Sequence, residues 1–229
     1  MRLLWLSVAV VAVACAAPRS GARGTASLAC GPGLTTAMRS TLRGTELWCE
    51  DDRGVRSGRF ERRLPSGTIV ERTSYAAGVL DGEFASFYAS GRPHWQGRYA
   101  RGQRDGAWRG WHENGKLWVE AAYASGQPTG AWLEYDYTGG KLFEGTYRDG
   151  RLEGTWRAFR NNGQVSASGA SQAGRLEGVM SKIGDDGSVV DVPYRDNRWH
   201  GTVIARDKDG KVVYRGEFVD GIEQASDAP

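Results

Sequence analysis

Glycine recurs at a fixed spacing of 24 residues through most of this 229-residue chain. Three sets keep this spacing, beginning at Gly54, Gly58 and Gly67, and only the last steps, such as the one to Gly201, shorten to 23 residues. A period of this length is typical of a repeat architecture, in which each unit packs only on its neighbours. The chain is therefore expected to form an array of about seven similar units over residues 58–221.

Aromatic side chains keep the same period in two rows. The first row is Phe60, Phe84, Trp108, Trp132 and Trp156, and the second is Tyr75, Tyr99, Tyr123 and Tyr147. Rows of this regularity are typical of side-chain ladders that pack across neighbouring strands. A stacking platform for sugars or lipid is the alternative interpretation.

Residues 106–129 illustrate how one unit is built. Two short strands, near residues 107–112 and 116–123, flank the Asn114–Gly115 pair, and the second strand alternates apolar and polar side chains as a half-buried strand does. Asn-Gly pairs favour tight hairpins, because both residues tolerate a positive φ. The sequence predicts an all-β fold, an elongated antiparallel β-meander of about seven stacked 24-residue β-hairpin repeats. In the fourth unit, Gly139–Gly140 is expected to cause a bulge or local slip.

The N-terminus has the features of an export signal. Arg2 precedes an apolar run that ends at Ala14 and is too short to span a bilayer comfortably as a helix. The small residues before Cys15 resemble the lipobox of bacterial lipoproteins, in which the cysteine becomes lipidated. Ala16 then implies sorting to the outer membrane, with the protein facing the periplasm or the cell surface. Ordinary cleavage with release of the chain is the alternative.

Three cysteines leave one over once a disulfide has formed. With Cys15 lipidated, Cys30 and Cys49 are the expected pair, and an oxidising compartment favours their bridge. Two reduced thiols are the alternative. We expect a signal peptide at residues 1–14, a flexible linker at 15–29, a disulfide-tied cap at 30–57 and a disordered tail at 222–229.

The charge balance argues against nucleic acid as a partner. Removing residues 1–14 takes away one of 30 basic residues and none of the 27 acidic ones, which leaves 29 against 27. Residues 53–116 hold 12 basic and 6 acidic side chains, whereas residues 117–229 hold 13 and 17. One end of the array is therefore basic and the other acidic.

Patterns that would indicate catalysis or a bound metal are missing from the sequence. His94, His112 and His200 lack the spacing of metal-ligand pairs, and neither a nucleophile elbow nor a phosphate-binding loop occurs. Acids recur just before one set of glycines, at Asp81, Asp105, Glu153 and Glu177, where a place in a turn explains them. The sequence predicts no enzyme activity, no cofactor and no metal site.

The aromatic residues outside the two rows are candidates for an exposed contact. They are Trp95, Trp118, Tyr137 and Trp199, and the arginines Arg92, Arg98, Arg101, Arg104 and Arg109 lie near the first two. We predict a binding surface from Trp95, Trp118, Arg98, Arg101 and Arg104, suited to an anionic partner such as a lipid headgroup, lipopolysaccharide or an acidic protein. Charges that keep the sheet soluble are the alternative. Trp95 and Trp118 occupy opposite phases of their strands, so they need not share a face.

The unit pattern, best seen in FEGTYRDGRLEGTWRAF (residues 143–159), resembles the MORN repeat and its bacterial variant, the YwqK-type antitoxin repeat. This resemblance covers residues 58–221 and implies an interaction module for proteins or membrane lipids, with no catalytic residues. We predict a non-enzymatic envelope-anchored lipoprotein that binds or scaffolds an envelope protein. The alternatives are an antitoxin or immunity protein with one dedicated toxin partner, and a module that binds phospholipid or an envelope polymer. A hydrolase of envelope polymers would need clustered acids or a histidine site, which the sequence lacks.

Overall fold

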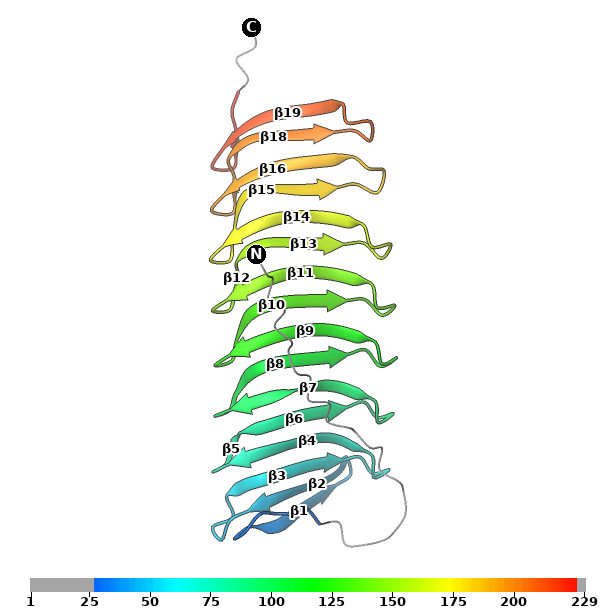
Figure 1. Cartoon of the computed structure of the whole chain (residues 1–229), viewed down its shortest axis with the longest axis vertical. Helices are drawn as coiled ribbons and strands as arrows, with labels where there is room; N and C mark the ends of the chain where they lie inside the picture. The colour runs from blue at the N-terminus through cyan, green and yellow to red at the C-terminus, as the bar shows by residue number, and fades with distance from the viewer. Residues whose placement is uncertain (1–26, 226–229) are drawn as a thin grey trace, which may run out of the picture.

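A computed structural model describes residues 27–225 of the chain. The predicted signal peptide and lipidation site, Cys15, lie outside these residues. The described part forms one open antiparallel sheet whose strands lie across the long axis of the molecule, one above the other (Figure 1). Residues 27–225 contain no helix, and hence no helix that could cross a membrane. The predicted all-β meander of stacked hairpins is confirmed.

The sheet contains the following strands. They are β1 (Thr35–Thr41), β2 (Gly44–Glu50), β3 (Arg56–Arg63), β4 (Ile69–Ala76), β5 (Val79–Leu80), β6 (Gly82–Phe87), β7 (Pro93–Ala100), β8 (Gln103–Trp111), β9 (Leu117–Ala124), β10 (Gln127–Tyr135), β11 (Lys141–Arg148), β12 (Arg151–Leu152), β13 (Gly154–Phe159), β14 (Val165–Gln172), β15 (Arg175–Ile183), β16 (Val189–Arg195), β17 (Arg198–Trp199), β18 (Gly201–Arg206), β19 (Val212–Val219) and β20 (Ile222–Glu223). The strands pair in chain order, and the two-residue strands β5, β12 and β17 are the first parts of longer strands that continue as β6, β13 and β18 after a bend near a glycine.

Two kinds of turn join the strands, one at each margin of the sheet. Between units the turn has two residues, as at Arg101 and Gly102, whose φ values of 50° and 80° are those of a type I′ turn. Within a unit the turn is wider: the His112 N–H donates to the Lys116 carbonyl at 2.8 Å, and Gly115 has a φ of 87°. The glycine period therefore places flexible residues where the backbone needs a positive φ.

From Phe84 to Tyr147, the two aromatic rows form one continuous ladder across the strands. Ring centroids along it lie 5.1 to 6.2 Å apart, in the order Phe84, Tyr99, Trp108, Tyr123, Trp132 and Tyr147. Trp108 is only 1% exposed and Phe60 only 5%. The interpretation of the rows as core ladders is thus confirmed for this stretch, and the rings stabilise the contact between units.

Gly139–Gly140 does not disturb the fourth unit. The Asp136 N–H donates to the Gly140 carbonyl at 2.8 Å, the same hydrogen bond that closes the turn between His112 and Lys116. A register shift does follow Glu134, but the corresponding shift occurs in five other hairpins. The expected bulge is therefore present, but Gly139–Gly140 is not its cause, because the same register shift recurs in other hairpins of the repeat.

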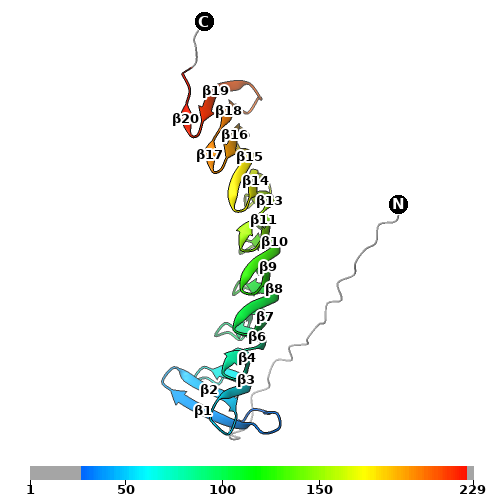
Figure 2. The ribbon, with the colours of Figure 1, turned by 90° about the vertical axis from the view of Figure 1, so that its left-hand side faces the viewer.

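The N-terminal end of the sheet is closed by the hairpin of β1 and β2. These two strands turn out of line with the rest of the sheet (Figure 2). A disulfide joins Cys30 to Cys49 with a Cα–Cα distance of 5.6 Å, and Leu47 and Cys49 are almost fully buried. The segment before β1 is therefore tied covalently to the second strand of the sheet.

The C-terminal end continues further than expected. Ile222 and Glu223 form β20, which pairs with Val219 and Phe218 of β19. The prediction that residues 222–229 form a disordered tail is wrong for these two residues, because the Asp220–Gly221 turn repeats the inter-unit turn and returns the chain to the sheet. A small apolar cluster of Val192, Val203 and Phe218 closes the core here.

Candidate binding surface

Aromatic side chains outside the ladder form a second, more exposed group near the wide turns of β6 to β11. We call Tyr88, His94, Trp95, His112, Trp118 and Tyr137 the aromatic strip. Its rings are linked by centroid distances of 4.5 Å (Tyr88 to His94), 6.0 Å (His94 to Trp95), 5.1 Å (Trp95 to Trp118), 6.2 Å (Trp118 to His112) and 5.2 Å (His112 to Tyr137). Tyr137 is 58% exposed and Trp118 is 39% exposed, whereas the other four rings are half-buried.

A β-bulge brings Trp95 and Trp118 together. In the pairing of β8 with β9, Gly110 lies opposite Val119 and Trp111 lies opposite Leu117, so Trp118 is the extra residue of the bulge. Alternation of side chains along the strands does not predict whether the two tryptophans lie on the same face of the sheet. The bulge reorients the Trp118 indole so that it packs on Trp95. The structure thus joins two of the residues that the sequence singled out.

The side chains at the wide turns also hold neighbouring units in place. The Tyr88 hydroxyl donates to the Trp111 carbonyl at 2.7 Å, and His112 Nε2 lies 3.0 Å from the Tyr135 carbonyl. Burial lowers the pKa of His94 below the ordinary value for histidine, so its ring favours the neutral form. The strip is therefore an aromatic surface on a firmly held backbone.

The three arginines of the predicted surface do not act together. Arg104 donates from Nη1 to the Tyr123 hydroxyl at 3.2 Å and lies over the Trp108 ring at 4.4 Å and the Trp95 ring at 5.3 Å, so it packs on the ladder and also contacts the strip. Gly97 in β7 faces the Trp108 ring of the ladder. Successive side chains alternate between the two faces of a sheet, so the next residue, Arg98, points away from the ladder. Arg101 lies in an inter-unit turn. A continuous surface made of Trp95, Trp118 and all three arginines is therefore wrong.

The recurring acids before the glycines are turn acceptors. Three of the four accept a hydrogen bond from the backbone N–H of the next inter-unit turn. The pairs are Arg101 with Asp81 at 3.0 Å, Ala173 with Glu153 at 2.7 Å and Asp196 with Glu177 at 3.1 Å. These carboxylates tie one unit to the next. They do not lie inside turns as expected, because Asp105 and Glu177 belong to strands β8 and β15, and Asp81 and Glu153 lie between two strand segments.

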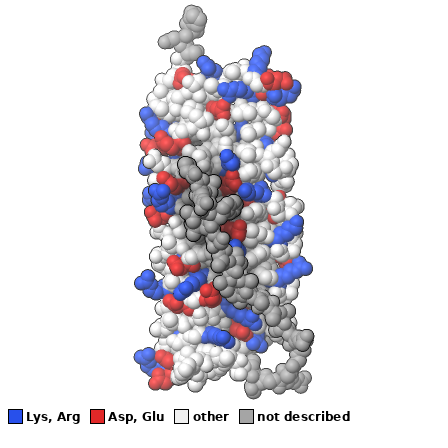
Figure 3. Space-filling model, viewed as in Figure 1, with Lys and Arg blue, Asp and Glu red and all other residues white. Residues whose placement is uncertain are grey.

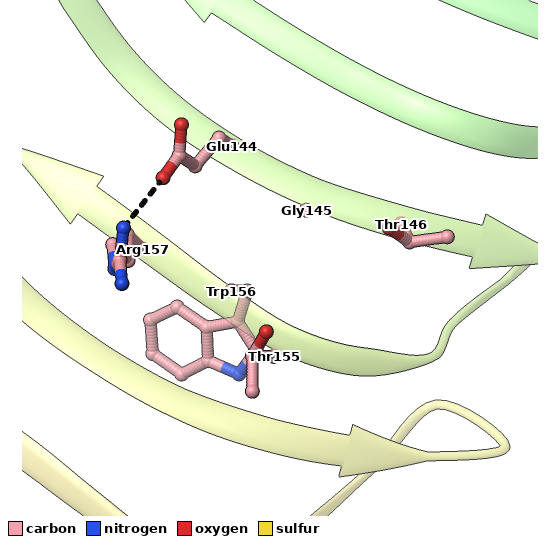
Figure 4. A pocket seen from close by; sticks show the side chains of 6 residues that line it. All are labelled: Glu144, Gly145, Thr146, Thr155, Trp156 and Arg157. Carbon is pink, nitrogen blue, oxygen red and sulfur yellow. Dashed lines mark hydrogen bonds and ion pairs between the residues drawn. The ribbon is translucent and has the colours of Figure 1, made fainter. Parts of the chain in front are cut away.

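A shallow hollow of about 260 Å³ lies between β11 and β13 (Figure 4), lined by Glu144, Gly145, Thr146, Thr155, Trp156 and Arg157. Glu144 accepts hydrogen bonds from Lys141 Nζ at 2.7 Å and Arg157 Nη1 at 3.3 Å. The Lys141 contact is the main cause that lowers the pKa of Glu144. A carboxylate held ionised by two cations is poorly suited to act as a general acid, and the hollow carries no group to pair with it in catalysis.

Charge is mixed along the sheet. Figure 3 shows Lys and Arg side chains beside Asp and Glu side chains over the length of one face. In the N-terminal half, where basic residues predominate, Arg62 pairs with Glu71 at 2.6 Å and Arg63 pairs with Glu61 at 2.7 Å. No group of three or more His, Cys, Asp or Glu side chains in residues 27–225 is placed to hold a metal ion.

The wide turn after β10 offers a pH test of the repeat geometry. Asp136 accepts hydrogen bonds from the Thr138 hydroxyl at 2.6 Å and the Gly140 N–H at 2.8 Å, and the hydroxyl contact is the main cause that lowers its pKa. A lowered pKa means that the ionised form stabilises the turn above the ordinary carboxyl range, and that this stabilisation is lost as the pH falls through the lowered value. We expect the Gly140 amide resonance in NMR to titrate with a midpoint below 3.8, the ordinary value. Thr138→Val should move the midpoint upward, and an unchanged midpoint would contradict this role of the hydroxyl.

These features define an elongated, single-sheet β-repeat protein with an open surface. One family model, the MORN repeat variant, matches residues 104–125, which cover most of the hairpin of β8 and β9. The match supports the MORN assignment of the repeat, and the other units share its period and its turns. None of the curated proteins matches the chain.

Proposed function

We propose that this protein is a non-enzymatic binding or scaffolding module whose contact surface is the aromatic strip. The observation that carries the proposal is the exposure of Trp118 and Tyr137 in a connected set of rings spanning three units. From Phe84 to Tyr147 the ladder already supplies the contact between units through rings that recur with the period, whereas Trp118 and Tyr137 have no Phe, Trp or Tyr counterpart at the same type of position in a second unit. Exposed aromatic side chains that the repeat does not require are typical of contact sites.

A protein is the partner that the strip suits best. Tryptophan and tyrosine are enriched among the residues that dominate protein interfaces, since they offer a large rigid area at a small cost in conformational entropy. The half-buried rings of Trp95 and His112 pack against the exposed rings of Trp118 and Tyr137. Mixed charge along the sheet favours a partner of mixed charge over a strongly anionic membrane surface.

The envelope is the proposed location. Cleavage before Cys15 and lipidation of that residue would anchor the sheet to a bacterial membrane, the outer membrane if sorting follows Ala16. The bridge between Cys30 and Cys49 supports an oxidising compartment, because disulfides persist outside the reducing cytosol. The anchor would set the location and the strip would select the partner.

The test is crosslinking in the native host followed by capture of the chain and mass spectrometry. We expect Trp118→Ser with Tyr137→Ser to reduce capture of the main envelope partner at least tenfold, because the two most exposed rings are lost. Val179→Ser is the matched control: Val179 is 56% exposed, lies in β15 away from the strip, and should leave capture unchanged. Equal capture by the double variant and the control would refute the strip as the binding surface.

A second arm of the same experiment uses Cys15→Ala. Loss of the membrane fraction in this variant is expected if Cys15 carries the lipid anchor. A single toxin-like partner, captured in place of an envelope component, would favour the YwqK-type antitoxin or immunity role. Recovery of phospholipid without protein would favour lipid binding.

A further inference from the structure

The outer side of β19 is an open sheet edge. Among residues 27–225, β19 pairs with β18 on one side, and on the other side β20 pairs only with Phe218 and Val219. The Gln224 N–H donates to the Glu217 carbonyl at 2.8 Å, which extends this cover by one residue. The segment from Val212 to Gly216 therefore has no described strand on its outer side. An uncovered sheet edge is a template for pairing with another strand.

Apolar side chains crowd this edge. The exposed fractions are 47% for Val212, 62% for Val213, 40% for Tyr214, 45% for Val219 and 70% for Ile222. Soluble proteins usually protect an edge strand with charges, proline or a covering segment, whereas this edge presents three consecutive apolar residues. The surface is therefore suited to burial.

The opposite edge of the sheet is different. β1 reads TTAMRST, and Met38 is its only large exposed apolar residue. Arg39 on this strand pairs with Glu46 at 2.7 Å. A polar edge of this kind is a poor match for the apolar edge at β19, so head-to-tail stacking of copies, which would also leave open ends, is disfavoured. The natural counterpart of the β19 edge is the same edge of a second copy.

Charge in and beside β19 restricts how two copies of this edge can align. Lys211 and Arg215 precede Gly216, Glu217 follows it, and neither cation forms an ion pair with another described residue. Antiparallel pairing centred on Tyr214 matches the open segment, Val212 to Gly216, with itself and sets no cation opposite a cation, while the outer side of Glu217 stays covered by Gln224. Pairing centred on Val213 would place Lys211 of one copy opposite Arg215 of the other. Pairing centred on Arg215 would place Arg215 opposite the same residue of the other copy. Like charges directly opposite are destabilising, which leaves the Tyr214 register.

We infer that two copies of this chain associate through antiparallel, two-fold pairing of their β19 edges, centred on Tyr214. This goes beyond the proposed binding function, because β19 lies several units away from the aromatic strip. A two-fold contact uses the same edge on both copies and closes the assembly as a dimer. The sheet then continues across the two-fold axis, and each copy keeps its strip free for a partner.

The experiment uses the full mature chain with Cys15→Ala, so that an added cysteine is the only free thiol beside the bridged pair. Light scattering after gel filtration should give the mass of a dimer, and Val213→Lys should give the mass of a monomer, because it places a lysine opposite Arg215 of the other copy. Val179→Lys, on an equally exposed valine away from the edge, should remain dimeric. Circular dichroism checks that each variant is folded.

Cysteine crosslinking tests the register. Residues directly opposite in an antiparallel pair have Cα atoms roughly 4.5–5.5 Å apart, within the range that a disulfide spans. Tyr214→Cys should therefore form a disulfide-linked dimer under mild oxidation, at least tenfold faster than Met38→Cys at the other edge. A monomeric mass for the unmodified edge at all concentrations, or equal crosslinking rates at positions 214 and 38, would overturn the inference. Neither result bears on capture by the aromatic strip.

Discussion

Trp108→Ala is expected to lower the free energy of unfolding by about 3–5 kcal/mol, the usual cost of removing a buried tryptophan. The indole is 1% exposed and lies against Gly97, where an added Cβ would come within 2.3 Å of the ring. Arg104 covers the ring at 4.4 Å from the centroid, and the indole N–H donates to the Arg98 carbonyl at 3.1 Å. Truncation would leave a cavity that rigid strands cannot close. Urea unfolding followed by circular dichroism measures the change.

Trp118→Ala is the matched control for that result. The residue type and the change are the same, but Trp118 is 39% exposed and lies on the surface of a bulge. Its loss should cost clearly less than that of Trp108, since less buried area disappears and no enclosed cavity is left. Equal losses for Trp108 and Trp118 would show that the ladder does not carry the stability of the central units.

Removing the disulfide is expected to cost about 3 kcal/mol of stability at the N-terminal end, the value for a loop of this length in the chain-entropy model. Cys30 and Cys49 are 19 residues apart in sequence. Because each unit contacts only its neighbours, Cys30→Ser should release β1 and β2 before the central units unfold. Hydrogen exchange of these strands is the measurement.

Protection of the backbone amides of β8 to β11 from hydrogen exchange serves as the internal reference for that experiment. It should stay unchanged in Cys30→Ser if the bridge acts locally. A uniform loss of protection along the sheet would instead mean that the array unfolds as one cooperative unit and that the hairpin of β1 and β2 nucleates it. Unaltered exchange in β1 and β2 would mean that the bridge does not hold the cap.

The candidate site combines residues that the sequence could and could not indicate. Trp95 and Trp118 were indicated because they fall outside the periodic aromatic rows. Tyr88 and His94 were missed as parts of the strip, because residues at turn and bulge positions carry no alternation signal. The charge of Arg104 suggests a surface role, whereas the structure lays its guanidinium over the rings of Trp108 and Trp95, so that it covers the ladder.

The repeat, the all-β class and the ladder follow from the sequence alone, because a 24-residue glycine period and alternating apolar positions leave hairpins as the only unit that fits. The thiol count predicts the pairing of Cys30 with Cys49 only when Cys15 is assigned to the lipid anchor, and the structure contains this bridge. Tertiary structure decided which exposed side chains meet: bulges reset the face of Trp118, and the bend before β20 covers part of β19 while leaving Val212 to Gly216 open. These outcomes depend on single-residue shifts of register, which reverse the face of a side chain while the sequence pattern stays the same.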